Sequence, residues 1–354
     1  MPSLAPPFDR PTPASFPHVF PNFTTGMTVP PFPPPDFDFL PPAGLLVGVF
    51  SIDSAFERRM LVRTTWASHP RSRDGASPGD GGRGTSRTIV RFILGQPSKD
   101  LEHRIKLEME CKFSLAFDIL LPLMINFLIV YNDIVILPVP ENMNNGKTYT
   151  FFSWAAINAW VPPIYISSGV PPPILSYSNS TSPPPPLAKH DPFLAWENIN
   201  SKLKPWVRPD YVIKVDDDSF IMLAELEARL RLELHMTKPR GPNFYETNST
   251  NGVRMLLPPP SHLQIPIESA YDDPLIYWGY LVTNRLHQFM AGELYALSWS
   301  LVDWVSKDAT VKTMIRGAED KQTAKWMRLH PRASEIRWTS ERCWIYDHPR
   351  SGTV

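Results

Sequence analysis

The sequence predicts an α/β fold with a mostly parallel central sheet flanked by helices, and three observations lead to this prediction. Residues 45–50, LLVGVF, form a continuous apolar run of strand length, as expected for a strand that is buried on both faces. Further runs of this kind alternate with segments of helical period along the chain. The hydrophobic fraction of 43% is large enough to form a substantial core.

The predicted elements follow one another as strand, loop and helix. The helix after the first strand runs to Trp66, and in it Phe56 and Met60, four residues apart, share one face. Ser54 and Glu57 form a capping box at its start. The other predicted strands are residues 89–94, 133–137 and 211–215. The other predicted helices are residues 101–109, 148–160, 223–234 and 320–329.

The proline content indicates the domain organisation. The 41 prolines are concentrated in three segments, residues 1–42, 161–186 and 256–266. Residues 1–43 lack any apolar period, which predicts a Pro-rich, disordered stem. We expect one folded domain over residues 44–350, interrupted by an apolar insert at 112–130 and a Pro-rich loop at 161–190.

The apolar insert fits the predicted domain badly. Residues 113–131 approach the length of a membrane span, with Asp118 as their one charged residue and Pro122 near the middle. A transmembrane helix here would divide the α/β domain, so we disfavour it. A second hypothesis is a buried hairpin. We favour a third, a retained intron, because codons for residues 111–113 can contain a splice donor and those for residues 129–130 an acceptor.

Charge, cysteines and glycosylation motifs limit the class of protein only weakly. Lys and Arg (35) balance Asp and Glu (35), so no global positive field attracts nucleic acid or an anionic membrane. Cys111 and Cys343 permit at most one disulfide. Glycosylation triplets begin at Asn22, Asn179 and Asn248, all in predicted loops, which fits a lumenal protein. No charged leader with an apolar run, as in a signal peptide or anchor, is recognisable at the N-terminus.

An acidic triplet carries the strongest chemical signal. Asp216, Asp217 and Asp218 directly follow the predicted strand 211–215, at the edge of the sheet where open α/β folds bind ligands. Neighbouring carboxylates repel each other unless a cation joins them, and oxygen ligands favour Mg²⁺ or Mn²⁺, which commonly bridge carboxylates to substrate phosphates. The alternative is a solvated acidic turn or helix N-cap. The position directly after a strand favours the metal site.

Six sequence blocks resemble, in this order, those of glycosyltransferase family 31. They are LLVGVFSIDSAFERRMLVRTTW, VRFILG, YNDIVILPVPENMNNGKT, YVIKVDDDSF, AGELYALSW and GAEDKQTAKW. The family contains β-1,3-galactosyltransferases, β-1,3-N-acetylglucosaminyltransferases and Fringe-like enzymes, and the chain is similar to its fungal members. The resemblance covers roughly residues 44–111, 131–160 and 205–350. It implies a GT-A fold, a Rossmann-like nucleotide-sugar domain, and inverting transfer of galactose or an N-acetylhexosamine from a UDP-sugar to a glycan hydroxyl.

The resemblance also implies a metal site, with Mn²⁺ (or Mg²⁺) as the ion. Asp218 matches the main metal ligand, Asp216 lies nearer the nucleotide ribose, and Asp217 supports them. A late histidine completes the site in the family, and His348 lies at about the expected distance, whereas His330 lies too near. The alternative for His348 is an ordinary surface histidine.

A carboxylate base is implied by the pair Glu319 and Asp320. A carboxylate that reaches the acceptor hydroxyl can remove its proton as the oxygen attacks the anomeric carbon. Asp320 is the first candidate for this base and Glu319 the second. The alternative is that both are first-turn residues favoured by the helix dipole.

Five more residues are considered for donor or acceptor contacts. Arg59 and Arg63 share a helical face, and Arg63 matches the arginine of the family's R-x-(T/S)-W block, so it is expected at the diphosphate. Lys147 matches the lysine of the block that family members write as NLTxKT. The alternative for both Arg63 and Lys147 is a solvated charge, and for Arg59 we expect this alternative. Gly292 would permit close approach of the backbone to a sugar. Trp278 would stack on an acceptor sugar or belong to the core.

The implied partners are a UDP-sugar and a glycan or glycoprotein acceptor, with no nucleic acid. Family members are type II Golgi membrane proteins that act in protein glycosylation, so we expect a Golgi location through an anchor outside this chain. Ala291 and Glu293 depart from the family's Gly-rich block, which leaves the donor sugar open. Two alternatives remain: an inactive family member that binds glycans or a partner enzyme, and a metal phosphohydrolase.

Overall fold

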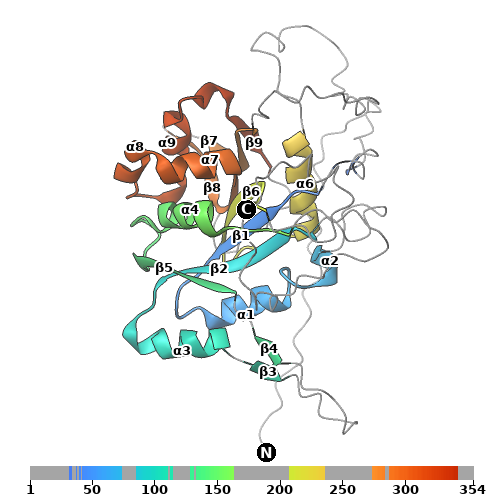
Figure 1. The fold of residues 1–354 in the computed structure, drawn as a ribbon, viewed down its shortest axis with the longest axis vertical. Coiled ribbons are helices and arrows are strands. Elements are labelled where there is room, and N and C mark those ends of the chain that lie inside the picture. Colours follow the sequence, from blue (N-terminus) through green and yellow to red (C-terminus); the bar gives the residue numbers. More distant parts are fainter. Residues whose placement is uncertain are drawn as a thin grey trace, which may run out of the picture.

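In the computed structural model, a seven-stranded sheet forms the centre of the protein, with the strand order β5-β2-β1-β6-β8-β7-β9 (Figure 1). The structure describes residues 42–73, 85–110, 112–114, 128–130, 133–162, 207–235, 273–283 and 287–341, with Phe32, Pro33, Phe37 and Leu40.

The sheet has a parallel half and a mostly antiparallel half. The parallel half contains β5 (Ile134–Pro140), β2 (Thr88–Gln96), β1 (Leu45–Phe50) and β6 (Tyr211–Asp216). The other half contains β8 (Gln288–Ser298), β7 (Ile276–Thr283) and β9 (Arg337–Ser340). Strand β8 runs antiparallel to both β6 and β7, and β9 is parallel to β7. The predicted mostly parallel sheet flanked by helices is confirmed, an arrangement consistent with a Rossmann-like GT-A fold.

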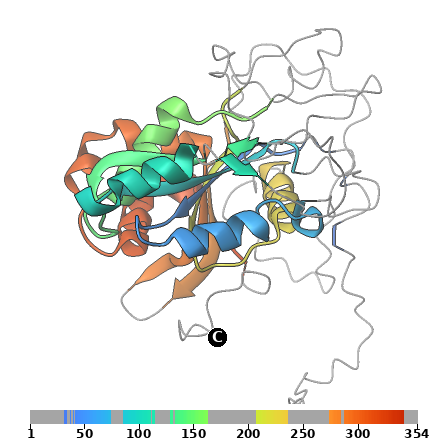
Figure 2. The ribbon, with the colours of Figure 1, turned by 90° about the horizontal axis from the view of Figure 1, so that it is seen from below.

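Helices cover both faces of the sheet, and Figure 2 shows α1 and α4 on opposite sides of it. One face carries α1 (Phe56–Thr64), α3 (Lys99–Glu110) and α6 (Leu223–His235). The opposite face carries α4 (Lys147–Asn158), α7 (Trp299–Lys307) and α9 (Glu319–Leu329). Short helices α2 (Pro70–Arg73), α8 (Ala309–Thr313) and η3 (Ala333–Glu335) complete the described helices.

The two cores follow from the alternation of side chains along the strands. In β1, Val47 points into the core that contains Val62 of α1, whereas Leu46 and Phe50 point into the core that contains Phe151 of α4. All six residues of β1 are buried, which explains why this strand is a continuous apolar run.

The predicted elements are confirmed in type and order, with shifts at their ends. Strand β1 has the predicted bounds, and helix α1 ends at Thr64 instead of Trp66. The predicted capping box is wrong, because the N-cap residue is Ala55 and no side chain caps the helix. Strands β7, β8 and β9 and helices α7 and α8 were not among the predicted elements.

The insert begins and ends in a two-stranded antiparallel pair. Strand β3 (Lys112–Ser114) pairs with β4 (Leu128–Val130), as the hairpin hypothesis requires of its two ends. Residues 115–127 lie outside the described residues, and the retained intron remains a hypothesis. Among the residues that the structure describes, no helix has both the length and the apolar character needed to cross a membrane.

Other predicted features also lie outside the described residues. These are nearly all of the stem, most of the Pro-rich loop, the three glycosylation triplets and both cysteines.

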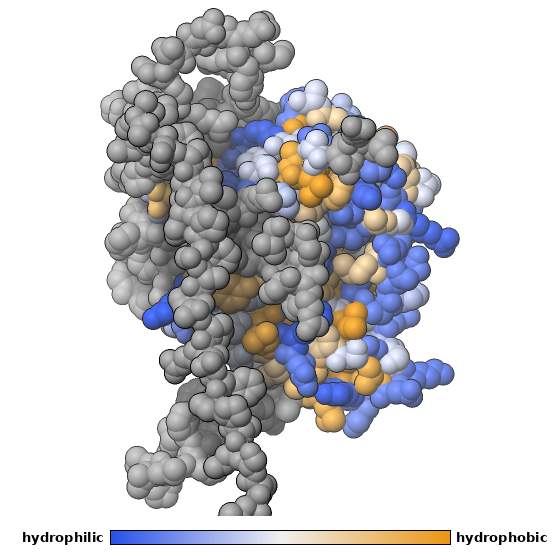
Figure 3. Space-filling view, turned by 180° about the vertical axis from the view of Figure 1, so that it is seen from behind, coloured by the Kyte–Doolittle hydropathy of each residue, from blue (hydrophilic) through white to orange (hydrophobic). Residues whose placement is uncertain are grey.

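On the face seen in Figure 3, hydrophobic side chains lie among hydrophilic ones. Apolar side chains scattered singly on a surface are common and do not imply a partner.

The chain changes direction across the sheet between β1 and β6. From β1 it continues to β2 and β5 on one side, and it returns to β6 on the other side of β1. Phe50, the last residue of β1, is paired in register with Asp216, the last residue of β6. Open α/β sheets bind ligands at such a switch point, beyond the carboxyl ends of the strands.

Candidate functional site

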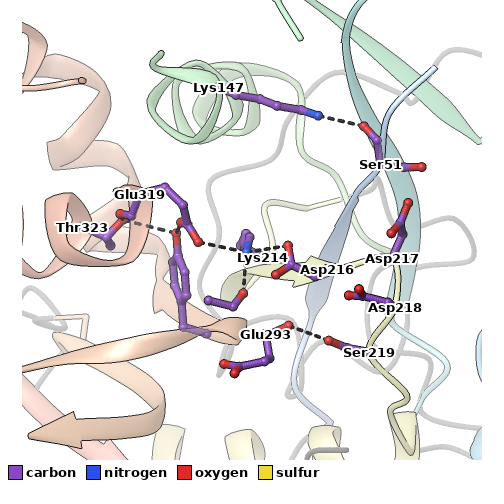
Figure 4. A network of polar contacts seen from close by, with 12 residues as sticks. Ser51, Lys147, Lys214, Asp216, Asp217, Asp218, Ser219, Glu293, Glu319 and Thr323 are labelled. Atoms are coloured by element: carbon purple, nitrogen blue, oxygen red, sulfur yellow. Dashed lines mark hydrogen bonds and ion pairs between the residues drawn. The ribbon is translucent and has the colours of Figure 1, made fainter. Parts of the chain in front are cut away.

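The acidic triplet lies at this switch point. Strand β6 ends at Asp216, and Asp217 and Asp218 form the turn that follows. The turn is fixed to the neighbouring strand β8, because the Ser219 hydroxyl donates a hydrogen bond to the carbonyl oxygen of Glu293, at 3.2 Å. Figure 4 shows the three aspartates in succession at this edge. The sheet therefore holds the carboxylates at the predicted place.

A buried lysine links the triplet to helix α9. The Lys214 ammonium nitrogen lies 2.7 Å from Asp216 Oδ1 and 2.9 Å from Glu319 Oε1, and it also donates to the carbonyl oxygen of Gly292 (Figure 4). The lysine side chain is 0% exposed. Burial lowers its pKa, but the charges of Glu319 and Asp216 outweigh burial, and the pKa is raised above its ordinary value. Lys214 is therefore charged at neutral pH.

Asp216 is part of this network and is thus less available to a metal than its neighbours. Its pKa is raised to about 6. Burial is the largest cause and the charges of Glu319 and Asp218 add to it, whereas the charge and hydrogen bond of Lys214 lower the pKa. The carboxylate is largely ionised at neutral pH and remains paired with Lys214.

The two candidate bases at the start of α9 differ in their contacts. Both oxygens of Glu319 accept hydrogen bonds, Oε1 from Lys214 and Oε2 from the Tyr295 hydroxyl at 2.5 Å. Asp320 Oδ1 accepts from the backbone nitrogen of Lys321, at 2.6 Å, a contact within the first helical turn. Burial raises the pKa of Asp320, which makes it a stronger base than an exposed aspartate. These contacts favour Asp320 as the base and Glu319 as the residue that positions α9.

Arg63 does not lie where the sequence predicted. Its guanidinium donates to both oxygens of Asp133, at 2.7 and 2.8 Å, and to Glu108 at 2.7 Å, and its side chain is 2% exposed. Arg59 is not solvated either, because it is fully buried and donates to Glu108 and Ser51. Neither arginine can reach a diphosphate without breaking buried ion pairs. Their role in this structure is to fix α1 on the sheet.

Arg58, the residue before Arg59, makes a contact that the sequence did not predict. Its Nη1 atom lies 2.9 Å from Asp217 Oδ1 and 3.4 Å from Asp218 Oδ2. The two carboxylates thus converge on one positively charged group. The hydrogen bond and charge of Asp217 raise the pKa of Arg58.

These two carboxylates fit a Mg²⁺ or Mn²⁺ ion that keeps several waters or phosphate oxygens as its other ligands. Within the described part of the chain, no group of three or more His, Cys, Asp and Glu residues is arranged to hold a metal ion. His348, the predicted further ligand, lies outside the described residues. The metal site therefore remains a prediction.

Lys147 and Gly292 both lie at this edge of the sheet. The Lys147 ammonium is buried and donates to the Ser51 carbonyl oxygen at 2.8 Å and to Glu141 Oε1 at 2.5 Å. Burial lowers its pKa, although the charge of Glu141 opposes this. Trp278 is fully buried, so it belongs to the core and not to an acceptor surface.

No protein-family model matches the chain. Over 202 residues, the chain is 23% identical to β-1,3-galactosyltransferase pvg3 of Schizosaccharomyces pombe. The chain is similar to a glycosyltransferase. The match covers 54% of this chain, and the chain spans 43% of the length of that relative.

The sequence did not lead us to predict Lys214 or Tyr295 as site residues, although the position of Lys214 in its strand is unusual. A lysine inside an otherwise apolar strand must find partners, because an unpaired charge is rarely buried. Its partner Glu319 was already a candidate. Tyr295 had no such signal, since buried tyrosines are common in cores.

Replacing Gly292 by Ala is expected to weaken the network. A Cβ atom here would lie 3.0 Å from Glu319 Oε1, so this carboxylate would have to shift, and 3.6 Å from Lys214 Nζ, an ordinary contact. We expect a loss of about 1 kcal/mol in the free energy of unfolding, the lower end for overpacking, and weaker binding of UDP. Urea denaturation and calorimetry measure the two effects. Parental stability together with parental UDP affinity would contradict this assignment.

Replacing Glu108 by Gln is expected to lower the free energy of unfolding by about 3 kcal/mol at neutral pH, because Arg59 and Arg63 lose a buried counter-charge. Burial raises the pKa of Glu108, but the hydrogen bonds and charges of the two arginines outweigh it and leave the pKa lowered. A carboxylate with a lowered pKa stabilises the fold above its ordinary value of 4.5 and ceases to do so as the pH falls through the folded value.

Urea denaturation of the parent and of Glu108→Gln between neutral and acidic pH measures this effect. The difference between the two proteins should be largest at neutral pH and should shrink as the pH falls below 4.5 and through the lowered pKa of Glu108 in the folded protein. Glu102→Gln is the matched control, since Glu102 is exposed on the same helix. A difference that does not depend on pH would argue against the ion pairs as its cause.

Proposed function

We propose that the protein is a metal-dependent, inverting glycosyltransferase of family 31 that transfers a hexosyl unit from a UDP-sugar to a glycan hydroxyl. The observation that carries this proposal is the convergence of the Asp217 and Asp218 carboxylates on one cationic point at the switch point of the sheet. The similarity to a β-1,3-galactosyltransferase supports it. Galactose and N-acetylhexosamines are the donor sugars that we propose, with glycoproteins as acceptors in the Golgi.

Asp218 and Asp217 would hold Mn²⁺, which when bound neutralises charge on the donor diphosphate and on departing UDP. Lys147 places its ammonium, paired with Glu141, at the carboxyl end of β1 beside Ser51. The network around Lys214 fixes the start of α9 relative to β6, since Glu319 is held by both Lys214 and Tyr295. The chain thereby positions groups on both sides of the expected donor.

Asp320 would act as the base at the acceptor. As the acceptor oxygen forms its bond to the anomeric carbon, the bond from that carbon to the UDP oxygen breaks and UDP leaves with the electron pair. Asp320 takes the proton of the acceptor hydroxyl. Burial of Asp320 raises its pKa, which improves its fit to this role.

The test is a panel of UDP-sugars with glycan acceptors and Mn²⁺, in which UDP release and product mass are measured for the full chain. Asp218→Asn should lower turnover by about 10² or more, a typical loss for an electrostatic contact at a developing charge. Asp303→Asn is the control, because Asp303 pairs with Lys307 in an exposed contact on α7. Equal turnover in Asp218→Asn and the parent would reject the proposal.

The other outcomes separate the remaining classes. Binding of glycans without any turnover would indicate an inactive, glycan-binding family member. Release of phosphate from simple phosphate esters would indicate a metal phosphohydrolase.

A further inference from the structure

Arg58 occupies the position that the proposed function assigns to a metal ion. Its side chain extends from α1 to the turn after β6, where a single nitrogen contacts Asp217 and Asp218. Because the oxygens that it contacts are those expected to bind the ion, the guanidinium and the ion compete for the same place. Two cations cannot both lie within contact of these carboxylates without strong repulsion.

The arginine can leave this position without movement of its helix. Helix α1 is fixed by the buried side chains of Arg59 and Arg63, both of which pair with Glu108. The Arg58 side chain, by contrast, is 56% exposed, so it can rotate into solvent. Asp217, in contrast, is only 8% exposed, so its carboxylate needs another positive charge when the arginine leaves. A bound metal ion would supply that charge.

A guanidinium that has left the aspartates can bind a second group at the same site, the donor diphosphate. Its planar group of donors matches the oxygens of a diphosphate, which it binds through paired, charge-assisted hydrogen bonds. The donor diphosphate is expected directly beside Asp217 and Asp218, within the reach of the same side chain. The exchange would therefore move one positive charge from the aspartates to the phosphates.

We propose that Arg58 is a positioning residue that pairs with Asp217 and Asp218 in the absence of a metal ion and turns to the donor diphosphate when the ion binds. This inference rests on the proposed function. Its consequence is that the ion and the nucleotide bind synergistically. A bound ion displaces Arg58 from the aspartates and frees it for the diphosphate, and a bound diphosphate holds Arg58 away from the aspartates.

The first arm of the test measures Mn²⁺ binding without nucleotide, by the electron paramagnetic resonance signal of free Mn²⁺. Arg58→Gln removes the competing charge and should bind Mn²⁺ roughly three- to thirtyfold more tightly than the parent, from the Coulomb energy of such charges near a surface. Arg58→Lys keeps the charge and should resemble the parent. Arg71→Gln, which removes an exposed arginine on α2, is the matched control and should also resemble the parent.

The second arm measures UDP binding at saturating Mn²⁺ by calorimetry. Arg58→Gln should weaken UDP binding about tenfold, the scale of one charge-assisted hydrogen bond, and Arg58→Lys should also weaken it because a lysine lacks the paired donors. Unchanged Mn²⁺ affinity in Arg58→Gln, or an equal gain in Arg71→Gln, overturns the inference. If Arg58→Gln does not fold, unchanged UDP affinity in Arg58→Lys overturns it. A parent that binds no Mn²⁺ rejects the proposed function itself.

Discussion

Replacing Asp320 by Asn is expected to lower kcat by about 10²- to 10⁴-fold, the range for loss of a general base. The substitution removes the proposed proton acceptor but leaves Asp217 and Asp218, the proposed metal ligands, unchanged, so the affinities for Mn²⁺ and UDP should stay at the parental level. Asparagine has nearly the shape of aspartate and can still accept a hydrogen bond from the Lys321 nitrogen. The fold at the start of α9 should therefore be retained.

The pH dependence of kcat/KM provides an independent check on Asp320. A base is active when deprotonated, so activity should fall as the pH falls through its pKa, which burial places above the ordinary value of 3.8. That acidic limb should disappear in the residual activity of Asp320→Asn. Retention of both the limb and the parental kcat would assign the base elsewhere, and Glu319→Gln would then be the next variant to measure.

Replacing Lys214 by Met is expected to lower the free energy of unfolding by about 3 kcal/mol, since it leaves two carboxylates without their shared counter-charge. For a domain of this size the loss corresponds to a fall of about 5 °C in Tm. Turnover should also fall, because α9 loses the contact that fixes Glu319, and Asp320 follows Glu319 directly.

Thermal unfolding followed by circular dichroism measures the change in stability. Lys307→Met is the control, because Lys307 pairs with Asp303 in an exposed contact and its removal should change stability by no more than about 0.5 kcal/mol. Similar losses in the two variants would show that burial of Lys214 has no special importance. Lys214→Arg should recover part of the stability only if the larger guanidinium fits between the same two carboxylates.

The parallel half of the fold could be predicted from the sequence, and the antiparallel half could not. Strand β1 is buried on both faces, so its apolar run has the same bounds as the strand. Strand β8 contains Gly292 and Glu293 in its middle. Its sequence therefore shows neither a continuous apolar run nor an alternation of apolar and polar residues. Tertiary pairing with β6 and β7 forms this strand, which a local pattern cannot show.

The position of the candidate site could be predicted from the sequence, but the ion pairs that its charged residues make could not. The place of the aspartates follows from a strand that ends at a sheet edge, which is local information. The partners of arginines are not local. Arg59 and Arg63 share a helical face as the spacing predicted, yet that face meets Glu108 and Asp133, which lie far along the chain. Arg58 lies on another face of the same helix, and its side chain contacts Asp217 and Asp218.

The bond between Lys214 and Glu319 has a consequence for how the site is assembled. These residues lie 105 positions apart, and the chain between them contains α6, β7, β8, α7 and α8. Closing so long a loop is entropically costly, and contacts distant in sequence tend to form slowly. A chain in which only the parallel strands have folded would hold the lysine without its second carboxylate. We therefore expect the site to be completed late in folding, so that UDP binding reports the integrity of the whole domain.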